Sequence, residues 1–228
     1  MKRAHFSPAL FTFLKELRRH NNREWFLANK GRYESDVREP LLRFIGDFAP
    51  HLHRISPHFV ADARPVGGSM FRIYRDTRFA RDKSPYKTVA AVQFRHEQGG
   101  DVHTPGFYLH LEPGNVFGGA GLWHPDSGSL RRVREAIVEH PEKWKRATSG
   151  RSFGRDYRLT GESLKRPPRG FDPEHPLIGD LRRKDFVATT SFTEEDACSP
   201  AFLTTYAKRA KFATEFMEFL TRAIDLRW

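Results

Sequence analysis

The strictest pattern in the chain is an alternation of apolar and polar positions over residues 107–112, which are Phe107, Tyr108, Leu109, His110, Leu111 and Glu112. Because neighbouring side chains of a β-strand point to opposite faces, this pattern predicts a strand with one buried face and one polar face. Shorter strand patterns lie close by, at residues 71–74, 88–95 and 116–117. Strands so close together in sequence favour antiparallel pairing in a meander.

Apolar stripes at helical spacing lie on both sides of this strand region. Within the first 57 residues they predict several helices, the first of which begins at Ser7 and Pro8. After the strands, they predict helices from residue 126, after Pro141 and from Pro200 almost to the end of the chain. The last helix is apolar over a wide arc. We therefore predict an α+β fold, in which N-terminal helices and a long buried C-terminal helix flank a central, mostly antiparallel sheet.

The whole chain, residues 1–228, is expected to form a single domain. A chain of 228 residues can bury a sizeable core without disulfides or a structural metal. Residues 150–176 are rich in Arg, Gly and Pro and predict an irregular insertion. Residues 186–188 predict one more strand.

The composition indicates the cellular compartment of the protein and the charge of its partners. Cys198 is the only cysteine, and the chain has neither a signal-peptide-like apolar run nor a stretch near the ~18 apolar residues of a membrane span. We expect a cytoplasmic protein with no membrane partner, and no pattern indicates an oligomeric state. The net charge of +11 favours anionic partners, such as nucleic acid, nucleotides and phosphorylated metabolites. A genome that favours Arg codons would explain the same charge.

Residues 70–87 carry the densest basic cluster. They hold two acids, Asp76 and Asp82, against six basic residues: Arg72, Arg75, Arg78, Arg81, Lys83 and Lys87. Guanidinium groups present paired donors that match phosphate and carboxylate groups, and lysines add point charges. The cluster predicts an anion-binding site formed by Arg72, Arg75, Arg78, Lys83 and Lys87.

The polar faces of the predicted strands carry candidate pocket-lining and catalytic side chains beside this cluster. In the predicted strand 71–74, Arg72 and Tyr74 share one face, and a turn at residues 82–87 presents Tyr86. If this strand joins the sheet of residues 107–112, Tyr108, His110 and Glu112 line the same face. The three tyrosines would line the pocket, and His110 or Glu112 would transfer a proton. The alternative is a solvated face on which arginines pair with Asp76 and Asp82.

Two weaker patterns suggest other ligands. The glycine-rich residues 118–121 precede a predicted helix and could hold an anion through backbone N–H groups, although they match no standard phosphate loop. Close packing is the alternative role. His110 and Glu112, with His103 and His124, could bind a divalent metal, but the spacing fits no standard metal motif. We therefore predict no cofactor.

Three blocks of the sequence occur together in a known order. They read NNREWF from Asn21, FRIYRDTRF followed by KSPYKT from Phe71, and GFYLHL followed by GLWHP from Gly106. In this order the chain resembles a widespread family of uncharacterised microbial proteins, known only as a domain of unknown function. The resemblance covers nearly the whole chain, which supports one domain. It implies no activity, cofactor or catalytic residue.

The first block has two interpretations. Its polar residues could cap a helix and form an ion-paired face. Alternatively, Arg23 or Lys30 could reach the basic cluster of residues 70–87.

The sequence is compatible with three functions. The first is binding of a phosphate-bearing ligand, extending to an enzyme that acts on a phosphorylated small molecule or nucleotide. The second is binding of nucleic acid by basic side chains together with Tyr74, Tyr86 and Tyr108. The third is a non-catalytic scaffold, in which the charged cluster stabilises the fold.

Overall fold

The computed structural model describes residues 4–100 and 103–228. The first part of the chain is helical, as predicted, and its apolar stripes are buried. Its elements are α1 (Pro8–Arg19), α2 (Arg23–Ala28), α3 (Lys30–Arg32), the π-helical segment η1 (Tyr33–Arg38) and α4 (Glu39–His53).

An antiparallel sheet forms the centre of the molecule, which confirms the predicted α+β fold. Its strands are β1 (Ala90–Arg95), β2 (Gly106–Glu112), β3 (Asn115–Leu122), β4 (Arg158–Thr160) and β5 (Phe186–Phe192), in the spatial order β1-β2-β3-β5-β4. The first three strands are the predicted meander. The alternation that predicts β2 is present in the structure, because Phe107, Leu109 and Leu111 are buried while the residues between them are partly exposed.

The remaining helices follow β3 and close the fold. They are α5 (Ser127–Glu139), α6 (Pro141–Ser149), α7 (Arg151–Asp156), α8 (Ile178–Leu181), α9 (Glu194–Cys198), α10 (Phe202–Phe212) and α11 (Thr214–Ala223). The C-terminal helix is present as two segments, α10 and α11, which meet at Ala213. The irregular insertion predicted at residues 150–176 is shorter than expected, because α7 and β4 lie within it. No helix in the described ranges is long and apolar enough to cross a membrane.

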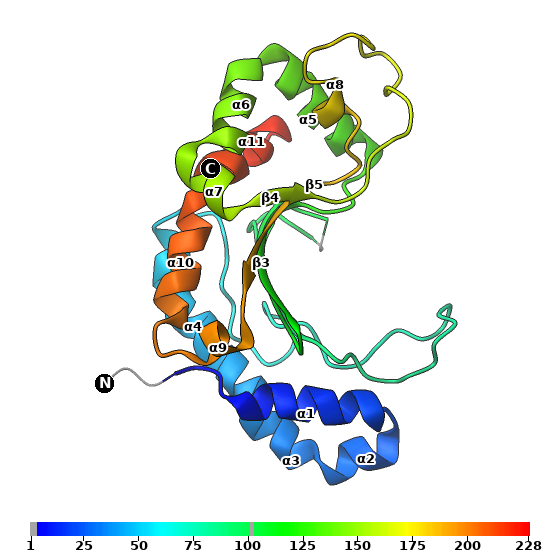
Figure 1. The fold of residues 1–228 in the computed structure, drawn as a ribbon, viewed down its shortest axis with the longest axis vertical. Helices are drawn as coiled ribbons and strands as arrows, with labels where there is room; N and C mark the ends of the chain where they lie inside the picture. Colours follow the sequence, from blue (N-terminus) through cyan, green and yellow to red (C-terminus); the bar gives the residue numbers. More distant parts are fainter. Residues whose placement is uncertain (1–3, 101–102) are drawn as a thin grey trace.

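The helices pack against one face of the sheet and leave the other open. Figure 1 shows α4 and α10 along one side, with α1–α3 at one end of the sheet and α5, α6 and α11 at the other. The covered face holds core residues such as Phe94, whose ring lies 4.7 Å from that of Phe48 on α4. The opposite face, here called the inner face, lies on the concave side of the ribbon and carries Tyr108, His110 and Phe117.

The prediction of a strand at residues 71–74 is wrong. Only single bridges join Met70 to Val92 and Tyr74 to Tyr86. Residues 70–87, here called the basic arm, fold back on themselves and extend away from the body (Figure 1). The acids of the arm explain this, because Asp76 and Asp82 accept hydrogen bonds from backbone N–H groups two residues ahead and form turns.

The glycine-rich residues 118–121 lie within β3, paired on both sides, and do not form a loop before a helix. They therefore provide no phosphate loop at a helix N-terminus. Gly121 has a φ angle of +138°, and a Cβ atom there would lie 2.1 Å from the carbonyl oxygen of Phe186. Close packing against β5 is thus the role that the structure supports for this glycine.

We predict that Gly121→Ala destabilises the protein by at least about 2–3 kcal/mol, because backbone strain and overpacking each cost about 1–3 kcal/mol. Gly31→Ala in α3 is the matched control, since an added Cβ there meets no atom within 4 Å. The control should be neutral or stabilising by up to about 1 kcal/mol. Urea unfolding of both variants measures the difference, and equal stabilities would contradict the argument.

Candidate functional site

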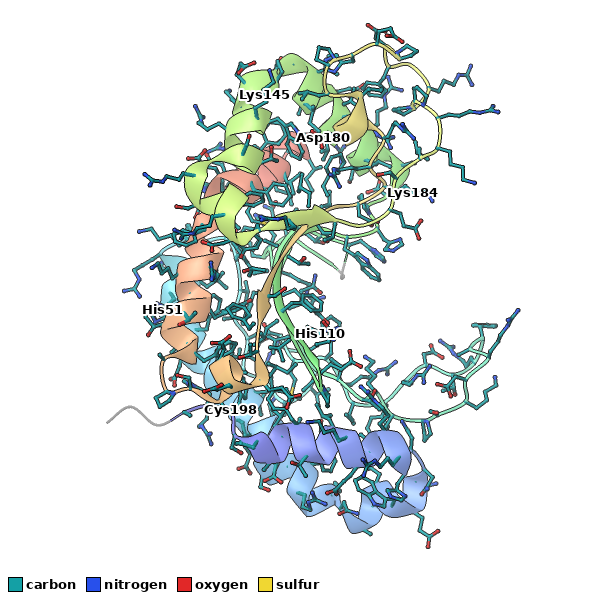
Figure 2. The ribbon with its side chains drawn as sticks, in the orientation of Figure 1. His51, His110, Lys145, Asp180, Lys184 and Cys198 are labelled. Atoms are coloured by element: carbon teal, nitrogen blue, oxygen red, sulfur yellow. The ribbon has the colours of Figure 1, made fainter. Side chains whose placement is uncertain are left out.

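The inner face is built from rows of residues on neighbouring strands. The pairing register places His110 opposite Ala91 on β1 and Phe117 on β3. It places Tyr108 opposite Gln93 and Gly119. Directly paired residues of an antiparallel sheet share a face, so these side chains point to the same side. Figure 2 shows His110 on the side of the sheet that faces away from α10.

A line of hydrogen bonds runs along β2 on this face. The Tyr108 hydroxyl lies 2.9 Å from Nδ1 of His110, and Nε2 of His110 lies 3.2 Å from Oε2 of Glu112. The other oxygen of Glu112 accepts a hydrogen bond of 2.8 Å from Arg18 on α1. The predicted grouping of Tyr108, His110 and Glu112 is therefore present. Arg18 completes the line, and no pattern in the sequence marks it, because α1 lies 94 residues away.

The partners of His110 define its tautomer. A carboxylate only accepts hydrogen bonds, so the proton of the neutral ring lies on Nε2, and Nδ1 accepts from the Tyr108 hydroxyl. Burial lowers the pKa of His110, although the hydrogen bond to Glu112 and its charge act in the opposite direction. Burial and the same charge raise the pKa of Tyr108 to about 12. The ring is thus neutral near pH 7 and able to accept a proton at Nδ1.

Glu112 remains ionised although it is partly buried. Burial raises its pKa, but hydrogen bonds from His110 and Asn115 and the charge of Arg18 outweigh this and hold the pKa below its usual value. The carboxylate therefore orients the His110 ring and would stabilise a positive charge on it.

Lys87 and Phe71 connect the basic arm to this line. The Phe71 ring lies 6.1 Å from the Tyr108 ring, and the Lys87 ammonium lies 5.3 Å from the centre of the Phe71 ring. Lys87 is half-buried, and both burial and the charge of Arg72 lower its pKa. Among the described residues, no carboxylate forms an ion pair with Lys87 or with the exposed Arg72.

The other predicted anion-binding residues bond within the arm. Arg75 pairs with Asp82, and Arg78 pairs with Asp76 at 2.6 Å. The Lys83 ammonium donates to the carbonyl oxygen of Thr77 at 2.9 Å. Of the five predicted cations, Arg72 and Lys87 form no ion pair within the described chain; Lys87 lies beside Phe71, and the charge of Arg72 acts on Lys87 and on Asp76.

Two of the predicted pocket tyrosines lie away from the inner face. Tyr86 is buried, its ring is stacked on Phe26 at 4.1 Å, and the half-exposed Tyr74 packs beside both rings. Asn21 holds the backbone of Tyr86 on both sides, since its side chain accepts from Tyr86 N–H at 3.0 Å and donates to Tyr86 C=O at 2.9 Å. Asn22 caps α2 by accepting from the N–H of Trp25. The first block of the sequence is thus a cap and an anchor for the arm.

The histidines named as possible metal ligands are separated. His103 stacks on Trp123, and His124 faces Asp185 at 4.0 Å. Within the part of the chain that the structure describes, no three His, Cys, Asp or Glu side chains could hold a metal ion together. His103 and His124 therefore do not join His110 and Glu112 in a metal-binding group.

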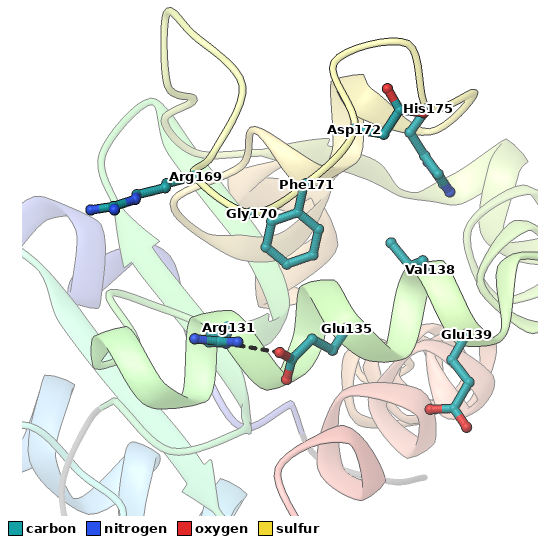
Figure 3. A pocket seen from close by; sticks show the side chains of 9 residues that line it. All are labelled: Arg131, Glu135, Val138, Glu139, Arg169, Gly170, Phe171, Asp172 and His175. Atoms are coloured by element: carbon teal, nitrogen blue, oxygen red, sulfur yellow. Dashed lines mark hydrogen bonds and ion pairs between the residues drawn. The ribbon is translucent and has the colours of Figure 1, made fainter.

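One open cavity of about 750 Å³ contains none of the predicted residues (Figure 3). It lies between α5 and the loop of residues 169–175, with Phe171 and Val138 in its walls. Arg131 and Glu135 form an ion pair across its floor. Its charges are mixed in sign, so it shows no preference for an anion.

We predict that His110 contributes a pH dependence to stability. Its pKa in the folded protein is lower than its usual 6.5, so the unfolded chain binds more protons near that pH. Stability should therefore fall as the pH drops below about 6.5, and His110→Gln should remove this part of the fall. Urea unfolding between about pH 5 and 8 measures it, with the exposed His53→Gln as control. An unchanged slope in His110→Gln would contradict the assignment.

A family described as "Conserved hypothetical protein (DUF2461)" matches residues 9–219. No curated protein and no solved structure matches the chain.

Proposed function

This chain belongs to the DUF2461 family of conserved hypothetical proteins, and we propose that it binds a phosphate-bearing ligand where Lys87 and Arg72 meet the inner face of the sheet. The observation that carries the proposal is Lys87. It is a half-buried ammonium group with no carboxylate partner in the described chain, and burial and a second cation already lower its pKa.

Such an arrangement is unfavourable without a counter-charge. Desolvation disfavours the charged form of a lysine, and Arg72 adds repulsion. An anion placed between the two side chains would offset both effects. A guanidinium and an ammonium together suit a phosphate group, because the first offers paired donors and the second a compact charge.

The hydrogen-bonded line along β2 would provide the chemistry beside the bound phosphate. Tyr108 contacts Phe71, which also contacts Lys87, so the phenol lies next to the proposed anion site. When Tyr108 releases its proton, Nδ1 of His110 accepts it, and the ionised Glu112 stabilises the imidazolium ion that results. In this proposal the protein is an enzyme that acts on a phosphorylated small molecule or nucleotide in the cytoplasm.

The two other functions have less support. Nucleic-acid binding was expected to use Tyr86, but this ring is buried and cannot stack on a base. A scaffold role fits the ion pairs of Arg75 and Arg78, which stabilise the arm from within. It does not account for the half-buried ammonium of Lys87, which has no carboxylate partner among the described residues.

We predict that Arg72→Ala and Lys87→Gln each weaken the binding of a phosphate-bearing ligand by about tenfold or more, since a hydrogen bond to a charged group contributes about 1.5–3 kcal/mol. Arg81→Ala is the matched control, because it removes an exposed arginine of the same arm. A thermal-shift screen of nucleotides and sugar phosphates finds the ligand, and calorimetry measures the affinities.

The same ligand tests the chemical step. His110→Gln should keep binding within about twofold and abolish turnover, because the ring accepts a proton but does not touch the phosphate. Equal binding by wild type, Arg72→Ala and Lys87→Gln would refute the proposed site. Unchanged turnover in His110→Gln would refute only the proton transfer.

A further inference from the structure

A second cavity lies on the opposite side of the molecule from the inner face. It has a volume of about 330 Å³ and is lined by residues of α7 and α10, namely Arg155, Asp156, Thr204, Thr205, Lys208, Arg209 and Phe212. Figure 1 shows α10 on the helix-covered side of the sheet, with α7 beside its C-terminal end. None of these residues contributes to the Lys87 site.

The charges in this cavity do not balance. The carboxylate of Asp156 is almost fully buried and pairs with two guanidinium groups, those of Arg155 and Arg209. Lys208 adds a third cation, and the cavity holds no second acid. Burial and the nearby charge of Arg155 lower the pKa of Arg209. Two positive charges therefore remain uncompensated around a single concave surface.

The remaining lining groups are hydrogen-bond donors and an aromatic ring. The hydroxyls of Thr204 and Thr205 form no hydrogen bond with any described residue. The Phe212 ring has Arg155 and Lys208 at the same distance of 5.8 Å, which holds both cations at the cavity. The site thus combines guanidinium N–H groups that Asp156 does not occupy, an ammonium group and two hydroxyls.

We propose that this cavity binds the phosphate of a small phosphomonoester. Such a group carries a charge of about −1.5 to −2 at pH 7, which matches the uncompensated charge of the site. Nε and Nη2 of Arg155 already donate to Asp156, so the remaining N–H groups of Arg155 and Arg209 would bind phosphate oxygens, together with Lys208 and the threonine hydroxyls. Asp156 holds the two arginines in place and repels an anion only weakly, because its own charge is already paired.

Calorimetric titration with inorganic phosphate at constant ionic strength tests this site. The Arg72→Ala/Lys87→Gln double variant removes the contribution of the inner face and should still bind phosphate. In that background, Lys208→Ala should weaken binding by about tenfold, and Thr204→Val with Thr205→Val by about fivefold or more. Lys211→Ala is the matched control, since it removes an exposed lysine of α10 outside the cavity and should leave the affinity unchanged.

Each outcome separates this site from the one on the inner face. Loss of all phosphate binding in the Arg72→Ala/Lys87→Gln variant would refute the second site and support the first. Equal binding by Lys208→Ala and Lys211→Ala would also refute it, as would equal heat from chloride. Tighter binding of glycerol 3-phosphate than of inorganic phosphate would support a phosphomonoester, because the cavity has room for the organic group.

Discussion

The strict alternation of β2 decides which of its side chains face the helices and which face the inner side of the sheet. Phe107, Leu109 and Leu111 are completely or almost completely buried against the helical side of the sheet. A shift of one residue in register would expose these three side chains and bury a histidine and a carboxylate in their place. The hydrophobic core therefore holds the polar line of Tyr108, His110 and Glu112 on the inner face, and the line needs no interaction of its own to keep it there.

The arm is positioned by a separate set of contacts, which come from the N-terminal helices. Asn21 binds both backbone polar groups of Tyr86, and Phe26 stacks on its ring. Lys87 follows Tyr86 directly, so its place beside Phe71 depends on the junction between α1 and α2. The contact joins the first and second sequence blocks of this chain, although 65 residues separate Asn21 from Tyr86.

Local patterns in the sequence predict the parts of the structure that local forces decide. The alternation of β2 and the start of α5 after Asp126 follow from side-chain periodicity and helix capping. The prediction of a strand at residues 71–74 is wrong because the alternation of apolar and polar residues there is short. The turns formed by Asp76 and Asp82, and the bridge between Tyr74 and Tyr86, decide the local structure instead. The hydrogen bond from Arg18 to Glu112 could not be predicted from the sequence, because the two residues are far apart in the chain and only the tertiary fold brings α1 to the end of β2. The pairing of Arg75 and Arg78 within the arm was foreseen only as an alternative.

The segment that replaces the predicted strand covers part of the β1 edge of the sheet. Phe71 N–H binds the carbonyl oxygen of Ala91, and Gln93 N–H binds that of Ser69, so part of the outer side of β1 is already paired. Beyond these bonds the arm turns away and carries a dense set of charges. At the other edge, β4 has only three residues. An exposed, regular edge strand invites pairing with another chain, and short or irregular charged edges prevent it. The same irregularity that places Lys87 beside Phe71 thus also protects the sheet from edge-to-edge aggregation.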